Sequence, residues 1–122
     1  MIYYIVGEKG KTTFLKSLGF PICRDNVSLY TSLEKGYKNI CMDDVTLRNN
    51  NYFKNIFNNI VLGTNILVWR KFKETKEINP KKDLNLYVAL HPSDWEDFPP
   101  EFKEIGVCLN IEQKETDKYV WR

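Results

Sequence analysis

The chain has 122 residues, of which 43% are hydrophobic and 14% aromatic, a composition that fits a globular core and excludes an intrinsically disordered chain. Its 18 basic and 16 acidic residues give a formal net charge of +2, which is too small to indicate a polyanionic partner by itself. The length predicts one domain over residues 1–122.

The first nineteen residues predict a strand, a glycine turn and a helix. The apolar run Ile2–Val6 is followed by GEKG at residues 7–10 and by KTT at residues 11–13. Glycines let a backbone curl around a phosphate, a lysine places a positive charge on its oxygens, and the next hydroxyl can bind Mg²⁺. The free N–H groups of a helix N-terminus also favour anions. The segment therefore predicts a phosphate-binding loop made by Gly7, Gly10, Lys11, Thr12 and Thr13.

This loop departs from the full pattern G-x-x-x-x-G-K-[ST]. The pattern requires a glycine at position 5, where the chain has Ile5, and counting from Gly7 leaves the loop two residues short. The alternative is a tight turn whose Lys11 and Thr12 face solvent. The place of the turn, after a strand and before a helix, favours the phosphate loop.

Two elements are expected next. Residues 20–26 contain Pro21 and an Asp-Asn pair and predict a loop, and Val27–Leu33 alternates apolar and hydroxyl residues, which predicts a half-buried strand. Three widely spaced cysteines, with no CxxC pair, predict buried reduced thiols and a reducing, cytoplasmic compartment: Cys23, Cys41 and Cys108.

The segment KNICMDDV at residues 38–45 predicts a short apolar strand that ends in two acids. After a phosphate loop, the first carboxylate of such a pair can hold Mg²⁺ and the second can activate a water molecule. Asp43 is therefore a candidate metal ligand and Asp44 a candidate general base. The alternative is a strand end that enters solvent.

The middle of the chain predicts a helix and a buried strand. Residues 47–62 place apolar side chains at helical spacing, and Gly63 ends the helix. Residues 64–72 contain the continuous apolar run Ile66–Trp69, which predicts a strand buried on both faces.

Residues 70–82 carry six basic residues against Glu74 and Glu77. Lysines and arginines bind nucleic-acid backbones by releasing condensed counterions, so the strip is a candidate nucleic-acid contact. The interleaved glutamates and the Asn79-Pro80 turn favour the alternative, a solvated hairpin. The candidate contacts are Arg70, Lys71, Lys73, Lys81 and Lys82.

A strand over residues 84–90 is followed by His91, which has no Cys or His partner nearby and so does not indicate zinc. The aromatic side chains of residues 93–102 are expected to pack on the sheet, and Pro99-Pro100 to stop any helix. Residues 106–111 predict a last strand, and Tyr119 to Trp121 an edge strand or a partner contact.

The elements alternate strand and helix early and become strand-rich late, which predicts a single-domain α/β sheet with flanking helices. No secretory signal is evident, and no uncharged run reaches membrane-spanning length without several asparagines. A soluble cytoplasmic protein that does not contact a membrane is the expectation.

Three segments, VGEKGKTT, KNICMDDV and LYVALHPSDWEDFPPEF, occur in an order that resembles P-loop NTPases with a strand inserted between the Walker A and Walker B strands. AAA-like enzymes and compact viral or phage replication and packaging ATPases have this arrangement. The resemblance implies ATP and Mg²⁺ as cofactors and a P-loop core. It implies phosphate binding by residues 7–13, Mg²⁺ at Thr12 and Asp43, a base at Asp44 and a polar sensor at His91.

The chain departs from the family in three further ways. Asp44 stands where the family usually has a catalytic glutamate, no arginine follows Pro99-Pro100, and a lid subdomain is lacking. We expect a minimal nucleotide-binding protein of a virus, phage or mobile element, a candidate NTPase acting on nucleic acid. The alternatives are a nucleic-acid-binding domain built on residues 70–82, and a non-enzymatic module that binds a host protein through residues 95–102. AAA-like enzymes also complete their sites in a homo-oligomer.

Overall fold

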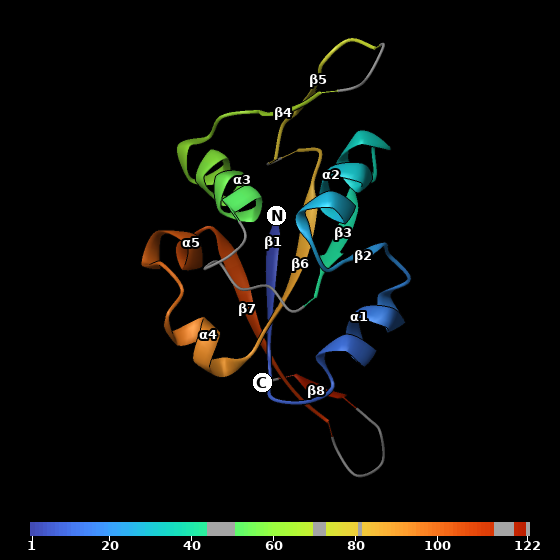
Figure 1. The fold of residues 1–122 in the computed structure, drawn as a ribbon. Coiled ribbons are helices and arrows are strands. Elements are labelled where there is room, and N and C mark those ends of the chain that lie inside the picture. The colour runs from blue at the N-terminus through green and yellow to red at the C-terminus, as the bar shows by residue number, and fades with distance from the viewer. Residues whose placement is uncertain (44–50, 70–72, 81, 114–118, 122) are drawn as a thin grey trace.

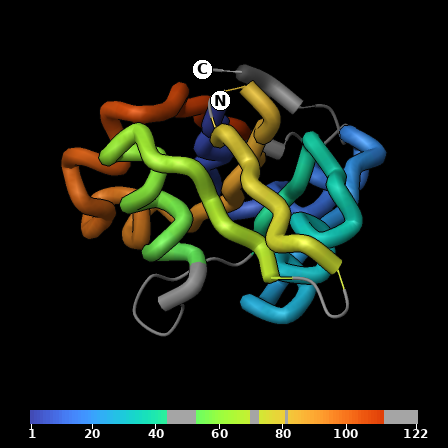
Figure 2. Tube along the Cα trace, turned by 90° about the horizontal axis from the view of Figure 1, so that it is seen from above, coloured from blue at the N-terminus to red at the C-terminus, as the bar shows by residue number. Residues whose placement is uncertain are grey.

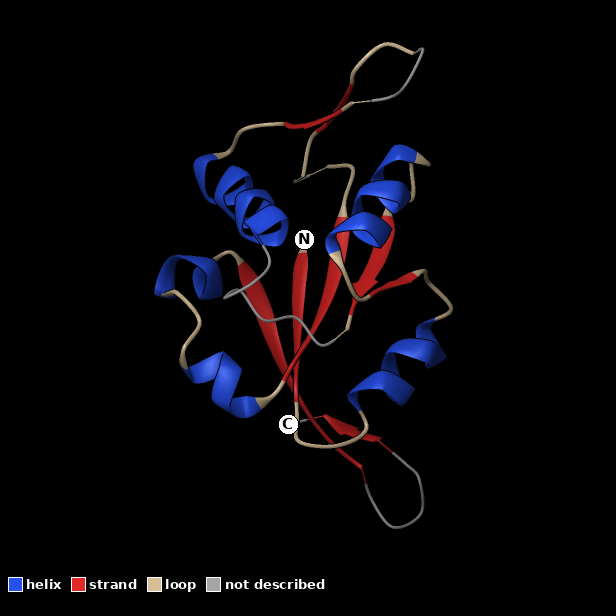
Figure 3. Cartoon of the chain, viewed as in Figure 1, coloured by secondary structure: helices blue, strands red, loops and turns tan. Residues whose placement is uncertain are grey.

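The computed structural model describes residues 1–43, 51–69, 73–80, 82–113 and 119–121 (Figures 1 and 3). The strands are β1 (Ile2–Val6), β2 (Ile22–Cys23), β3 (Asn39–Met42), β4 (Ile66–Val68), β5 (Lys76–Ile78), β6 (Asn85–Leu90), β7 (Gly106–Gln113) and β8 (Tyr119–Trp121). The helices are α1 (Lys11–Leu18), α2 (Asn26–Glu34), α3 (Asn51–Leu62), α4 (Pro92–Glu96) and α5 (Pro100–Glu104).

The main sheet has six strands in the order β2-β3-β6-β1-β7-β8. The first five in that order run parallel, and β8 pairs antiparallel with β7, which confirms the predicted edge strand. Strands β4 and β5 form a separate antiparallel pair. The fold is therefore α/β, a parallel sheet with flanking helices, as the sequence predicts.

Helices cover both faces of the sheet. Because successive side chains of a strand point to opposite faces, neighbouring residues of β1 contact different helices. Tyr4 and Val6 of β1 pack in a core with side chains of α2, α3 and α5. Ile5 points the other way and packs with Phe14 and Leu15 of α1. Parallel strands buried on both faces read as apolar runs, which is why β1 and β6 are clear in the sequence.

A cluster of aromatic side chains packs α3, α4 and α5 against Tyr4 of β1. Tyr4 is fully buried, and its ring centroid lies 4.9 Å from that of Trp95 and 5.4 Å from that of Phe98. Its hydroxyl donates a 2.6 Å hydrogen bond to the carbonyl of Phe102, and burial raises the pKa of this phenol. The prediction that residues 93–102 pack their aromatic side chains on the sheet is confirmed.

The predicted strand over Val27–Leu33 is wrong, because these residues lie in helix α2. Asp25 caps the helix by accepting the N–H of Ser28, and the Ser28 side chain completes a capping box. Buried Leu29 and Leu33 then lie on one face of the helix, while Val27 is exposed. The strand of this region is β2, inside the segment predicted as a loop.

Two further predictions are wrong, one about the double proline and one about the burial of a strand. Pro99 is the N-cap of α5 and Pro100 its first residue, so the double proline starts a helix instead of stopping one. Strand β4 is not buried on both faces, because Leu67 is 60% exposed and Trp69 is 75% exposed. It belongs to the β4–β5 pair, which Figure 2 shows crossing over one end of the molecule.

Cys23, Cys41 and Cys108 are free thiols, as predicted. Cys23 and Cys41 are buried and Cys108 is half-buried; burial raises the pKa of Cys41 to about 11. Among the described helices, none has both the length and the apolar character needed to cross a bilayer.

Candidate functional site

The loop at residues 7–10 joins β1 to α1 at the carboxyl edge of the sheet (Figure 1). Gly7 donates its N–H to the carbonyl of Leu90, so the loop starts beside the end of β6. Gly10 is the N-cap of α1 and has φ 85°, a left-handed conformation that favours glycine. The sequence-predicted order of strand, glycine loop and helix is therefore correct.

The two loop glycines differ in what requires them. A Cβ atom on Gly7 would lie 2.9 Å from the carbonyl oxygen of Ile111 and 3.0 Å from its Cγ1 atom. Gly7 thus allows the end of β7 to approach the loop closely. Its role in packing was not apparent in the sequence, because Ile111 is more than one hundred residues away in the chain.

Lys11 extends back over the loop that precedes it. Its Nζ atom donates hydrogen bonds to the carbonyl oxygens of Gly7, at 2.5 Å, and of Glu8, at 3.4 Å. Helix α1 has no acidic residue in its first turn and no side-chain cap. The ammonium group and the positive end of the helix therefore lie together, an arrangement that favours an anion.

Thr12 and Asp43 meet although they are 31 positions apart in the sequence. The Thr12 hydroxyl donates a 2.8 Å hydrogen bond to Oδ2 of Asp43. Asp43 follows β3 directly and is only 4% exposed, so it is not a strand end that enters solvent. The structure therefore brings together the hydroxyl that follows Gly-Lys and the first acid that follows the apolar strand.

Arg24 is a member of this site that the sequence reading did not identify. Its Nη2 atom lies 3.5 Å from Oδ2 of Asp43. Because Cys23 pairs with Met42, the residues that follow these two strands lie side by side. The capping box at Asp25 and Ser28 marks the start of α2 directly after Arg24, but it does not indicate the contact of Arg24 with Asp43.

His91 lies beside the loop but also has a structural partner. It follows β6 and is the N-cap of α4, where its Nδ1 atom accepts the N–H of Ser93 at 3.2 Å. The Ser93 hydroxyl lies 2.8 Å from the same nitrogen. The ring is exposed, and helix capping accounts for the contacts that the structure gives it.

The remaining predicted site residues are Thr13, Asp44 and the basic residues of the strip at residues 70–82. Thr13 is exposed in the first turn of α1, whereas Asp44 lies outside the described residues. Lys73 and Lys82 are exposed, one before and one after β5 in the sequence. The β4–β5 pair lies at the opposite end of the molecule from the loop (Figure 1). Arg70, Lys71 and Lys81 also lie outside the described residues.

A divalent cation would find few protein ligands here. The described residues contain no group of three or more His, Cys, Asp or Glu side chains that could hold a metal. Mg²⁺ often binds through one carboxylate and a hydroxyl, with phosphates and water completing its shell. The buried carboxylate of Asp43 and the hydroxyl of Thr12 fit that kind of site, in which the nucleotide supplies the other ligands.

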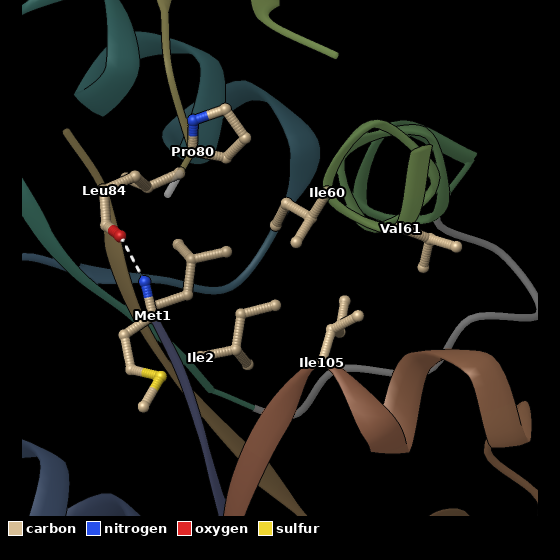
Figure 4. A pocket seen from close by; sticks show the side chains of 8 residues that line it. Met1, Ile2, Ile60, Val61, Pro80, Leu84 and Ile105 are labelled. Atoms are coloured by element: carbon tan, nitrogen blue, oxygen red, sulfur yellow. Dashed lines mark hydrogen bonds between the residues drawn. The ribbon is translucent and has the colours of Figure 1, made fainter. Parts of the chain in front are cut away.

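An apolar cavity of about 330 Å³ lies at the amino ends of β1 and β6, where Met1 and Leu84 line it (Figure 4). The α-amino group of Met1 donates to the carbonyl of Leu84 at its rim, and Ile60 and Ile105 face it. The cavity contains none of the predicted site residues.

No protein-family model matches the chain, and no curated protein matches it at a significant level.

Proposed function

We propose that this protein binds a nucleoside triphosphate together with Mg²⁺ at the carboxyl edge of its sheet. The observation that carries the proposal is the hydrogen bond from Thr12 to the buried carboxylate of Asp43. A phosphate loop needs a hydroxyl and an acid together at the metal, and these two side chains are brought together from separate elements.

The strand order supports the same proposal. Strand β6 lies between β1, which leads into the loop, and β3, which leads into Asp43. This agrees with the P-loop NTPases that the sequence resembles, which insert a strand between the Walker A and Walker B strands. By that resemblance the core is a P-loop core and the nucleotide is ATP.

The loop, the start of α1 and Asp43 would each bind a different part of the Mg-triphosphate. Lys11 would exchange the carbonyl oxygens of Gly7 and Glu8 for phosphate oxygens, which are stronger partners for an ammonium group because they are charged. The N–H groups of the first turn of α1 would bind the same phosphates. Thr12 and Asp43 would hold Mg²⁺, which neutralises phosphate charge when it is bound.

The proposal is limited to binding. Hydrolysis requires a group that activates water, and Asp44, the predicted base, lies outside the described residues.

The alternative function, binding of a host protein through residues 95–102, has little exposed aromatic surface to support it. Phe98 and Phe102 are buried in the core, and Trp95 packs on Tyr4.

Calorimetric titration with Mg-ATP tests the proposal. Lys11→Ala is expected to weaken binding at least about tenfold, or about 1.4 kcal/mol, because it removes a charge-assisted contact to phosphate. Lys16→Ala removes the same charge from an exposed position further along α1 and is expected to bind like the wild type. Absence of Mg-ATP binding by the wild type would refute the proposal.

A second candidate function is binding of single-stranded nucleic acid by the β4–β5 pair. The favouring observation is Trp69, 75% exposed directly after β4, with the exposed Lys73 just before β5. A binding surface for single strands combines an exposed aromatic ring for base stacking with basic side chains for phosphate contacts. Of the other basic residues of this strip, Lys76 lies in β5 and Lys82 is exposed after it, whereas those at 70, 71 and 81 lie outside the described residues.

Trp69→Ala should reduce affinity for a single-stranded oligonucleotide by about 5- to 150-fold, the usual contribution of one stacked base. Fluorescence anisotropy at several salt concentrations measures this, and affinity should fall steeply with salt. Val27→Ala trims an equally exposed apolar side chain on α2 and serves as control. Affinity that is flat with salt and equal in Trp69→Ala would exclude this function.

A further inference from the structure

The carboxylate of Asp43 has two partners on the same oxygen. Oδ2 accepts the hydroxyl of Thr12 at 2.8 Å and lies 3.5 Å from Nη2 of Arg24. The Asp43 side chain is 6% exposed, whereas that of Arg24 is 62% exposed. A buried carboxylate needs a compensating charge, and the guanidinium supplies it.

The backbone on each side of this pair is fixed, but the Arg24 side chain is not enclosed. The N–H of Asp43 donates to the carbonyl of Cys23 at 2.9 Å, which holds the two strand ends together. The N–H of Arg24 donates to the Ser28 hydroxyl at the start of α2. The guanidinium, being largely exposed, can leave Asp43 without any change in these backbone contacts.

We propose that Arg24 occupies Asp43 in place of a divalent cation and must leave this carboxylate when the metal binds. A guanidinium and a divalent cation cannot both lie close to one carboxylate oxygen, because their charges repel each other. The Thr12 hydroxyl is neutral and can remain. Arg24 is therefore a positioning residue that sets how tightly the site takes up metal, an inference that rests on the proposed function.

This exchange links metal uptake to the charge state of the site. With metal absent, Arg24 lowers the cost of burying Asp43 and keeps the carboxylate close to Thr12. With metal present, the released guanidinium is solvated by water, to which its side chain is already 62% exposed. Removal of the guanidinium should therefore favour metal over the metal-free state.

Titration with Mn²⁺, followed by electron paramagnetic resonance, tests the exchange in the wild type and in Arg24→Ala, Arg24→Lys and Lys35→Ala. Mn²⁺ should bind Arg24→Ala about two- to fivefold more tightly than the wild type, the strength of a half-exposed ion pair. Arg24→Lys retains a charge and should lie between the two. Lys35→Ala removes an exposed charge at the far end of α2 and should match the wild type.

The titrations are run with and without ADP, so that the two proposals can fail separately. Equal Mn²⁺ affinity in the wild type and Arg24→Ala, or no Mn²⁺ binding to either, would overturn the exchange. An equal gain in Lys35→Ala would overturn it too, because the effect would then be one of net charge. Tighter Mn²⁺ binding by Arg24→Ala without any binding of ADP would support the exchange and contradict the proposed nucleotide site.

Discussion

Phe57→Ala should lower the free energy of unfolding by about 3–5 kcal/mol, the usual cost of removing a buried aromatic ring. Phe57 is fully buried on α3. Its ring centroid lies 5.4 Å from that of Phe102, 5.8 Å from that of Phe98 and 6.4 Å from that of Tyr4. Its loss would leave a cavity between α3, α5 and the first strand, where the surrounding rings cannot collapse fully.

Urea denaturation followed by circular dichroism measures this change. Leu62→Ala, at the exposed end of the same helix, is the matched control and should change stability by no more than about 0.5 kcal/mol. If Phe57→Ala and Leu62→Ala had equal small effects, the described packing of α3 on the sheet would be incorrect.

Asp43→Asn should abolish most of the effect of Mg²⁺ on nucleotide affinity. In the wild type, Mg²⁺ should strengthen ATP binding at least about tenfold, and in Asp43→Asn the ratio of the affinities with and without Mg²⁺ should fall towards one. An asparagine oxygen can still accept the Thr12 hydroxyl, so the local packing is kept. What is lost is the charge that a divalent cation requires.

Fluorescent ATP analogues titrated with and without Mg²⁺ give the four affinities. Asp83→Asn makes the same chemical change at an exposed site just before β6, on the other edge of the sheet, and should keep the wild-type ratio. Melting temperatures of both variants, compared with the wild type, show whether either change unfolds the protein. An unchanged Mg²⁺ effect in Asp43→Asn would remove Asp43 from the metal site.

The central strands were predictable because they are buried on both faces. Ile2–Val6 is a continuous apolar run and residues 84–90 are apolar apart from Asn85, and these segments form β1 and β6. The helix of residues 51–62 was predictable from its apolar spacing.

Helix α2 was not predictable from alternation alone. Val27–Leu33 alternates apolar and hydroxyl residues, and the same residues place Leu29 and Leu33 one helical turn apart. The cap from Asp25 to Ser28 decides between these periods in favour of the helix. A local hydrogen bond at the helix start therefore outweighed a hydrophobic pattern.

The candidate site was predictable where its residues follow strands. Lys11 and Thr12 were predicted from the glycine loop after the first strand, and Asp43 from the acids that follow an apolar strand. Arg24 and Ile111 were not, because their contacts depend on the pairing of β2 with β3 and on the approach of β7 to the loop. Such register contacts leave no local trace in the sequence.

Backbone amide NMR of the labelled protein, with and without Mg-ATP, tests the proposed site most directly. We expect the largest shift changes at residues 7–13 and at Asp43, with little change at Ile60 and Ile105 beside the apolar cavity. An unchanged spectrum, or changes confined to the cavity, would contradict nucleotide binding at the carboxyl edge of the sheet.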